Sequence, residues 1–175
     1  GFGEYGFPES HAHSFALLAY ASSWLKCHEP ACFLAALLNS QPMGFYSASQ
    51  LVQDARRHGV RVLPIDVASS DSDCTLEGPA ERLRPARGLP TPLLPQPAVR
   101  LGLCLVSGLH ASAMQRLLQA RAAGPFNSTE DLALRAQLSP QDLQALAAAD
   151  ALASLSGHRR QQMWDAAAQQ SEPPL

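Results

Sequence analysis

The first part of the chain carries apolar side chains at helical spacing. Ser10 precedes the pattern and is a candidate N-cap. The apolar positions are Phe15, Leu17, Leu18, Ala21, Trp24 and Leu25. Pro30 disfavours helical geometry at the residue before it, so this helix should end near Cys27 and His28.

Two further helices are predicted before Gly59. Pro30 can open the second helix as its first residue, because its missing N–H would have no intrahelical partner there. The apolar positions of this helix are Phe33, Leu34, Leu37 and Leu38. Residues 41–44, QPMG, break it. Ser47 and Gln50 then form a capping box for the third helix, which ends at Gly59.

The centre of the chain changes to strand and loop patterns. Residues 60–67, VRVLPIDV, are β-branched and partly alternating, which predicts a short strand. Residues 78–98 are rich in proline and show little periodicity, which predicts a linker or an extended excursion. Residues 98–109, AVRLGLCLVSGL, are typical of a strand that runs into a glycine turn.

Short helices are predicted in the last third. Ser128 and Ser139 are candidate caps, and Pro140 suits a first helical position. The predicted helices cover residues 111–123, 129–137, 140–149 and 157–169. The fold class is therefore mainly α with a few short strands.

The composition argues against a membrane-spanning segment and against purely electrostatic binding of nucleic acid. The 175 residues are 46% hydrophobic, and no apolar run approaches the roughly 20 residues of a membrane span. A net charge of −2 argues against binding nucleic acid by bulk electrostatics. The charge is uneven, however. Residues 79–100 contain one acid, Glu81, and the arginines Arg82, Arg84, Arg87 and Arg100.

The four cysteines are scattered and predict reduced thiols in a cytoplasmic protein. A metal site could be assembled from His11, His13, Cys27, His28 and Cys32. The C-x4-C spacing across a helix break is not the tight pair usual for zinc, and structural cysteine is the commoner explanation. We therefore expect no bound metal.

The start of the first helix is a candidate phosphate site. Ser10, His11 and Ser14 cluster where free N–H groups and the helix dipole favour an anion. A protonated histidine there could add a charge-assisted hydrogen bond. The alternative is simple capping by Ser10 with His11 exposed.

Asp71 and Asp73 form a D-x-D pair within SSDSDC. Two-metal nucleotidyl transfer needs a carboxylate cluster on a rigid strand. Serines surround this pair, and the apolar strand precedes it instead of containing it. A solvated turn is the better interpretation.

The stretch LVSGLHASAMQRLLQARAAG resembles a helix-hairpin-helix element. Such turns present backbone amides to a DNA phosphate without reading bases. Ser107, Gly108, Leu109 and His110 form the turn, and a helix follows it. The usual motif has glycines on both sides of the apolar residue, whereas His110 takes the second place here. An ordinary turn between elements is the alternative.

Residues 1–67 closely resemble the late fingers region of bacterial DNA polymerase III alpha subunits, the C family. The resemblance is carried by GFGEYGFPESHAHSFALLAY, NSQPMGFYS and DARRHGVRVLPIDV. Glu9 stands where replicative members tend to have lysine, as in the error-prone, damage-inducible translesion branch. Later stretches extend the resemblance over nearly the whole chain: AVRLGLCLVSGL, LQARAAGPFNSTEDLALRA and LAAADALASLSGHRRQQMW. The absence of an initiating methionine fits the expectation of a fragment.

The resemblance implies a catalytic function that lies elsewhere in the parent polypeptide. Family members add deoxynucleotides to a primer 3′ end with two Mg²⁺ ions held by palm aspartates. No residue of this chain matches the palm motif. We expect the chain alone to be inactive, with the Mg²⁺ ligands outside it.

The resemblance also assigns roles within the chain. Residues 1–78 would be the end of the fingers, with Ser10, His11 and Ser14 facing the incoming deoxynucleoside triphosphate. Residues 79–98 would be a Pro/Arg-rich linker, residues 99–170 a tandem helix-hairpin-helix-like module, and residues 171–175 a tail. The residues expected at DNA are Ser107, Gly108, Leu109 and His110 in one turn, and Ser156 and Gly157 near Leu155 in another. His110 departs from the family's glycine.

The implied partners are primer–template DNA, the incoming nucleotide and accessory mutagenesis proteins. No clear clamp-binding peptide is visible, so any contact with the sliding clamp would be indirect. The alternative is a stand-alone, non-catalytic module that binds DNA or docks to a protein. Weak net charge and backbone-amide contacts predict modest DNA affinity and a shallow salt dependence.

Overall fold

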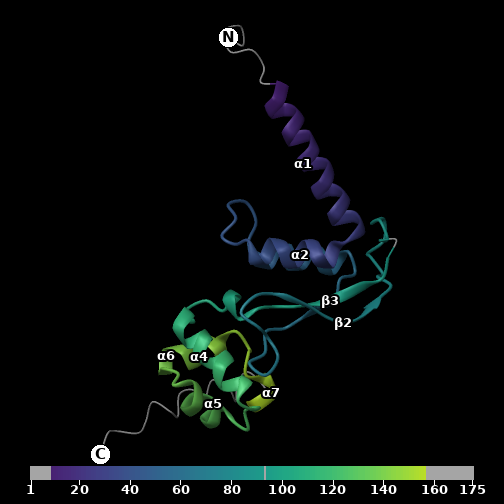
Figure 1. Cartoon of the computed structure of the whole chain (residues 1–175). Coiled ribbons are helices and arrows are strands. Elements are labelled where there is room, and N and C mark those ends of the chain that lie inside the picture. The colour runs from purple at the N-terminus through teal and green to yellow at the C-terminus, as the bar shows by residue number, and fades with distance from the viewer. Residues whose placement is uncertain (1–8, 93, 157–175) are drawn as a thin grey trace, which may run out of the picture.

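The computed structural model describes residues 9–92 and 94–156, and it is mainly helical with one small sheet (Figure 1). The elements are α1 (Glu9–His28), α2 (Pro30–Asn39), α3 (Ala48–Arg57), β1 (Val62–Leu63), β2 (Thr75–Glu81), β3 (Gln96–Arg100), the 3₁₀ turn η1 (Leu103–Leu105), α4 (Ala111–Ala122), α5 (Thr129–Ala136), α6 (Pro140–Ala148) and α7 (Ala153–Ser156). The predicted fold class is confirmed.

Helix α1 projects away from the rest of the molecule (Figure 1). It already includes Glu9, so the predicted N-cap role of Ser10 is wrong, because an N-cap residue has non-helical backbone and Ser10 is helical. Its end at His28 agrees with the prediction. Glu29 has φ −129° and ψ 54°, the non-helical geometry expected before Pro30.

Helices α2 and α3 begin where the sequence predicts, α2 at a proline and α3 at a capping box. Pro30 lies at the start of α2. The backbone N–H of Gln50 donates to the Ser47 hydroxyl over 3.3 Å, and the Ser47 N–H donates to the Gln50 side chain over 2.9 Å. Helix α3 ends at Arg57, and Gly59 reverses the chain with φ 86°. A left-handed residue at this point is the usual way to end a helix.

The sheet has the order β1-β3-β2, with β1 parallel and β2 antiparallel to β3. The strand predicted over residues 60–67 is only Val62–Leu63, because Pro64 has no N–H to continue the ladder. The stretch expected to be a linker, 79–98, is structured at both ends, where β2 and β3 pair. Glycine and proline within β2 obscured this strand, and a register shift accommodates them.

Two hydrophobic clusters form the core of the described residues. The first packs α2 and α3 on the sheet and contains Ala31, Leu34, Leu38, Ala55, Val60, Leu83 and Val99. The second fills the helical module of α4–α7 and contains Leu103, Leu117, Phe126, Leu132, Leu143, Leu146 and Leu152. A buried amide, Gln96, secures the first cluster, since its side chain donates to the His28 carbonyl over 3.0 Å and accepts from the Ala31 N–H over 3.4 Å.

The helical module follows the predicted breaks closely. The hydroxyls of Ser128 and Ser139 both accept N–H groups in the first turns of α5 and α6, which confirms the two caps. Pro140 opens α6. The helix predicted over 157–169 lies outside the described residues. Before it, the structure contains the short helix α7.

Two predictions from composition can be compared with the structure. All four cysteines are free thiols. Within residues 9–92 and 94–156, no helix is long and apolar enough to cross a membrane.

Candidate nucleic-acid interface

The hairpin predicted at residues 107–110 is an exposed turn between η1 and α4. The N–H of Leu109 donates to the Val106 carbonyl over 3.3 Å, and Leu109 packs on the core of the helical module. Gly108 has φ 85°, so an L side chain would be strained there. Ser107, Gly108 and His110 are exposed. The structure therefore brings these four residues together in the geometry that the sequence predicted.

His110 is bound to a buried carboxylate that the sequence analysis missed. Its Nδ1 lies 2.9 Å from Oδ1 of Asp142, whose residue is 2% exposed. The other oxygen of Asp142 accepts from the N–H and hydroxyl of Ser139, over 3.1 and 2.6 Å. Asp142 thus links the start of α6 to the start of α4. Its S-x-x-D capping pattern was a local signal, but nothing in the sequence indicated the contact with His110.

Hydrogen bonding controls the ionisation of Asp142. Burial alone would raise the pKa of this carboxyl, but hydrogen bonds from Ser139 and His110 outweigh burial and lower the pKa below its ordinary value. A stable negative charge therefore faces the imidazole of His110. Because the side chain of His110 is 62% exposed, its other ring nitrogen remains able to meet a ligand.

The arginines of the helical module bind backbone carbonyls. Arg116 donates to the carbonyls of Ala136 and Gln137 at the end of α5, over 2.9 and 3.0 Å. Arg135 donates to carbonyls at the end of α4, including Gly124 over 2.8 Å, and stacks on Phe126. Arg121 joins the module to the preceding loop through Ser70 and Asp71. Among the described residues of the module, arginine thus serves structure.

The remaining polar groups at the hairpin are backbone amides. The N–H groups in the first turn of a helix have no intrahelical acceptor, and those of Ala111 and Ser112 lie at exposed residues. The N–H of His110 is directed at Asp142, over 3.4 Å. The start of α4 therefore offers partly positive amides beside an imidazole, which suits a phosphate oxygen.

The second predicted turn is only partly within the described residues. Ser156 is the last residue of α7, and Gly157 lies outside them. Leu155 packs on the core of the helical module. The expectation for this turn stays a prediction.

The candidate nucleotide site lies at the free end of α1, remote from the hairpin (Figure 1). Ser10 and His11 fall in the first turn, and Ser14 lies one turn later. His11 and Ser14 are exposed, and the ring of His11 stacks on Phe15 with centroids 4.4 Å apart. The structure does not bring these residues together with the hairpin.

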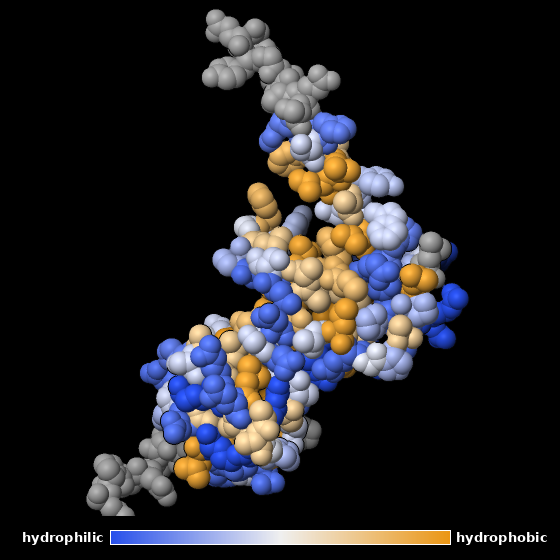
Figure 2. Space-filling view, viewed as in Figure 1, coloured by the Kyte–Doolittle hydropathy of each residue, from blue (hydrophilic) through white to orange (hydrophobic). Residues whose placement is uncertain are grey.

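Helix α1 exposes apolar side chains along its length, and several orange patches interrupt the paler and blue residues on it in Figure 2. They are Phe15, Leu17, Leu18, Tyr20, Trp24 and Leu25, each at least 43% exposed. A helix that is apolar on most sides is normally buried by other protein.

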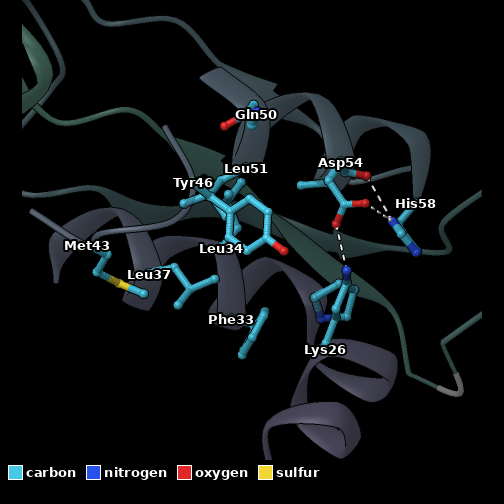
Figure 3. Close-up of a pocket in the computed structure, with 12 residues that line it drawn as sticks. Lys26, Phe33, Leu34, Leu37, Met43, Tyr46, Gln50, Leu51, Asp54 and His58 are labelled. Carbon is cyan, nitrogen blue, oxygen red and sulfur yellow. Dashed lines mark hydrogen bonds and ion pairs between the residues drawn. The ribbon is translucent and has the colours of Figure 1, made fainter. Parts of the chain in front are cut away.

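A pocket of about 530 Å³ opens between α2 and α3, near the end of α1 (Figure 3). Its walls are mostly apolar and include Phe33, Leu37, Met43 and Tyr46. At the polar end of the pocket, the Asp54 carboxylate pairs with Lys26 over 2.9 Å. The backbone carbonyl of Asp54 lies 2.8 Å from Nδ1 of His58. These groups satisfy one another, so the pocket suits an apolar group better than a charged ligand.

The two other candidate sites, the D-x-D pair and the possible metal ligands, do not form a catalytic or metal-binding cluster among the described residues. Asp71 and Asp73 are exposed in a bend, and Asp71 pairs with Arg121 over 2.7 Å. The solvated turn was the better interpretation. No three metal-ligating side chains cluster within the described part of the chain, which includes His11, His13, Cys27, His28 and Cys32.

Comparison with known proteins gives one family and one group of relatives. A helix-hairpin-helix motif family matches residues 59–162. The error-prone DNA polymerase of Methylococcus capsulatus is 60% identical over all of this chain and 17% of its own length. Those of Bordetella parapertussis and Burkholderia pseudomallei are 62% and 61% identical over 96% and 100% of this chain. The chain spans 15–17% of the length of these relatives.

Proposed function

Because the chain belongs to the helix-hairpin-helix family and is homologous to a segment of error-prone DNA polymerases, we propose that it holds duplex DNA for such a polymerase. The observation that carries the proposal is the exposed hairpin, residues 107–110, within the matched range. Its amides would bind a backbone phosphate, and His110, oriented by Asp142, would add a second donor.

The parent activity would be deoxynucleotidyl transfer in damage-induced translesion synthesis. The two Mg²⁺ ions would be held by aspartates outside this chain, so the chain contributes binding and not the chemical step. Residues 1–78 would belong to the fingers, 79–98 would connect, and 99–170 would form the DNA-holding module. Ser156 and Gly157 would serve a second hairpin. Cytoplasmic accessory mutagenesis proteins would connect the polymerase to the sliding clamp.

The hairpin is tested best by a substitution that helps the helix and harms the phosphate contact. Ser112→Glu adds a carboxylate to the first turn of α4, where a negative charge favours the helix dipole. We expect unchanged or slightly higher thermal stability but at least fivefold weaker binding of a labelled 20-base-pair duplex in fluorescence anisotropy.

The matched control is Gln119→Glu, which adds the same charge at an exposed position further along α4. It should leave duplex affinity within about twofold of the unaltered chain. Equal affinities for the Ser112→Glu and Gln119→Glu chains would mean that the hairpin is an ordinary turn without a DNA contact. Gly108→Val is a poorer test, because the positive φ of Gly108 makes any side chain destabilising.

The nucleotide-facing role of α1 is a separate part of the proposal. It rests on the exposure of His11 and Ser14 and on the homology of the segment. In the full-length polymerase, His11→Ala should raise the nucleotide KM or lower kcat with DNA affinity nearly unchanged. The exposed neighbour His13 offers a control, as His13→Ala. Identical kinetics for both variants would remove His11 from the site.

A protein-docking role is the second candidate, and the exposed apolar surface of α1 favours it. The partner we propose is the remaining part of the longer polymerase polypeptide, since the relatives extend far beyond this chain. We expect the isolated chain to self-associate through this exposed surface, and Leu17→Glu with Leu18→Glu should reduce that self-association in analytical ultracentrifugation. In the full-length protein the same pair should lower the melting temperature, and an unchanged melting temperature would contradict this docking.

A further inference from the structure

An arginine cluster lies at the opposite end of the sheet from the hairpin and has no place in the function proposed above. We define it as the arginine patch: Arg56, Arg57, Arg82, Arg84 and Arg87. The first two end α3, and the others lie in the connection from β2 to β3. This connection is at the far end of β3 from α4 (Figure 1).

Three contacts hold the connection against the end of α3. The N–H of Ala86 donates to the Arg57 carbonyl over 2.8 Å. A Cβ atom at Gly59 would lie 2.9 Å from the backbone of Arg84, so the two segments are in close contact and glycine is required there. Leu83 is buried in the same cluster as Ala55 and Val60. Arginines that are 25 residues or more apart in the sequence therefore share one surface.

The guanidinium groups of the patch are exposed and unpaired within the described residues. All five residues are exposed, and none forms a hydrogen bond or ion pair through its side chain there. The nearby acids are already engaged: Glu81 faces Arg61 over 3.5 Å, Glu77 pairs with Arg100, and Asp54 pairs with Lys26. Blue, hydrophilic residues gather on this side of the molecule in Figure 2.

The patch has the chemistry of a polyanion site. Neighbouring like charges repel one another, and the dipole of α3 favours cations only within the last turn of the helix. Guanidinium groups match phosphate oxygens in a bidentate geometry. Prolines at 85, 90, 92 and 95 restrict the connection, which lowers the entropy lost when the loop is ordered on binding.

We propose that the arginine patch binds the phosphodiester backbone of DNA as a second contact, separate from the hairpin. The inference rests on the proposed function only in taking DNA as the ligand. It changes one expectation, because the net charge of −2 predicts a shallow salt dependence whereas five exposed cations on one surface predict a steeper one.

The test is Arg84→Gln with Arg87→Gln in the 175-residue chain, titrated into labelled DNA at several salt concentrations. We expect at least tenfold weaker binding at about 0.1 M salt and a slope of log K against log salt that is smaller by about 1.5–2. The melting temperature should not change, since these side chains have no partners among the described residues.

Two control variants isolate the cause. Gln119→Glu with Gln144→Glu produces the same change in net charge at exposed positions of the helical module, and it should leave the slope nearly unaltered. Arg84→Lys with Arg87→Lys preserves the charge and should keep the slope, with only a few-fold loss of affinity. If the Gln→Glu pair and the Arg→Gln pair weaken DNA binding equally, the change in net charge is responsible, and the proposal of DNA binding by the patch is overturned.

The outcomes separate the two sites and the two forms of DNA. If only Ser112→Glu weakens binding, the patch proposal fails and the hairpin stands. If only Arg84→Gln with Arg87→Gln does so, the hairpin fails and the patch stands. A loss confined to a 20-nucleotide single strand, or to the duplex, supports the patch and identifies its form of DNA. No saturable binding by the unaltered chain at 50 mM salt overturns both.

Discussion

Arginine has opposite roles in the two regions of this molecule. In the helical module, Arg116 and Arg135 each donate to carbonyls at the end of a neighbouring helix. Around α3 and the β2–β3 connection, residues such as Arg84 and Arg87 are exposed with no side-chain partner in the described part of the chain. Charge that is engaged stabilises the fold, whereas charge that is unpaired remains available to a ligand. The positions of arginines in the sequence therefore do not reveal which ones are available to a ligand.

The comparison is sharpened most by one substitution in each region. Arg135→Gln removes bonds to the Pro125 and Gly124 carbonyls and the stacking on Phe126, and should lower the free energy of unfolding by about 2–3 kcal/mol. Arg87→Gln should change it by less than about 0.5 kcal/mol. Urea denaturation followed by circular dichroism measures both values. Equal losses would mean that the patch arginines are also structural.

Asp142→Asn should have the next largest effect. The amide keeps the size of the side chain but cannot accept from both Ser139 and His110 as the carboxylate does. We expect the free energy of unfolding to fall by about 1–2 kcal/mol, the range of a lost cap and buried hydrogen bond. Asp73→Asn, at an exposed position in the bend before β2, provides the comparison. A loss no greater than that of Asp73→Asn would show that the bonds of Asp142 have no structural value.

The same carboxylate predicts the direction of one pH effect. The pKa of Asp142 is lowered in the folded chain, so its contribution to stability is fully present above the unfolded value of about 3.9. This contribution is lost as the pH falls through the lower folded pKa. Urea midpoints between pH 6 and pH 3 should therefore decrease less in Asp142→Asn than in the unaltered chain. Parallel decreases would assign the acid sensitivity to other groups.

His110→Gln should have a smaller effect on stability than Asp142→Asn. The His110 side chain is 62% exposed, so solvent screens its side of the pair with the buried Asp142, and we expect a loss of about 0–1 kcal/mol. Duplex affinity should nevertheless fall a few-fold, because a donor at the hairpin is lost. Fluorescence anisotropy with the labelled 20-base-pair duplex measures this loss. An affinity equal to that of the unaltered chain would exclude His110 from the phosphate contact.

Much of the helical structure could be predicted because capping is a local interaction. Ser47, Ser128 and Ser139 each bond to a residue three positions on, so both partners are visible in one short window. The hairpin at Gly108 was found for the same reason. Strand β2 was not, because its residues do not favour a strand and pairing with β3 decides its conformation.

By itself the sequence determined the mainly helical class, most of the helix boundaries, the glycine turn at residues 107–110 and the resemblance to error-prone polymerases. Only the tertiary structure decided which charges are engaged. The contact between His110 and Asp142 joins residues 32 positions apart. The hydrogen bond from the Ala86 N–H to the Arg57 carbonyl joins the β2–β3 connection to the end of α3. Such pairs depend on how helices and loops pack, and no spacing rule along the chain specifies them. The fold therefore decides whether an arginine binds the carbonyls at a helix end or remains exposed to a ligand.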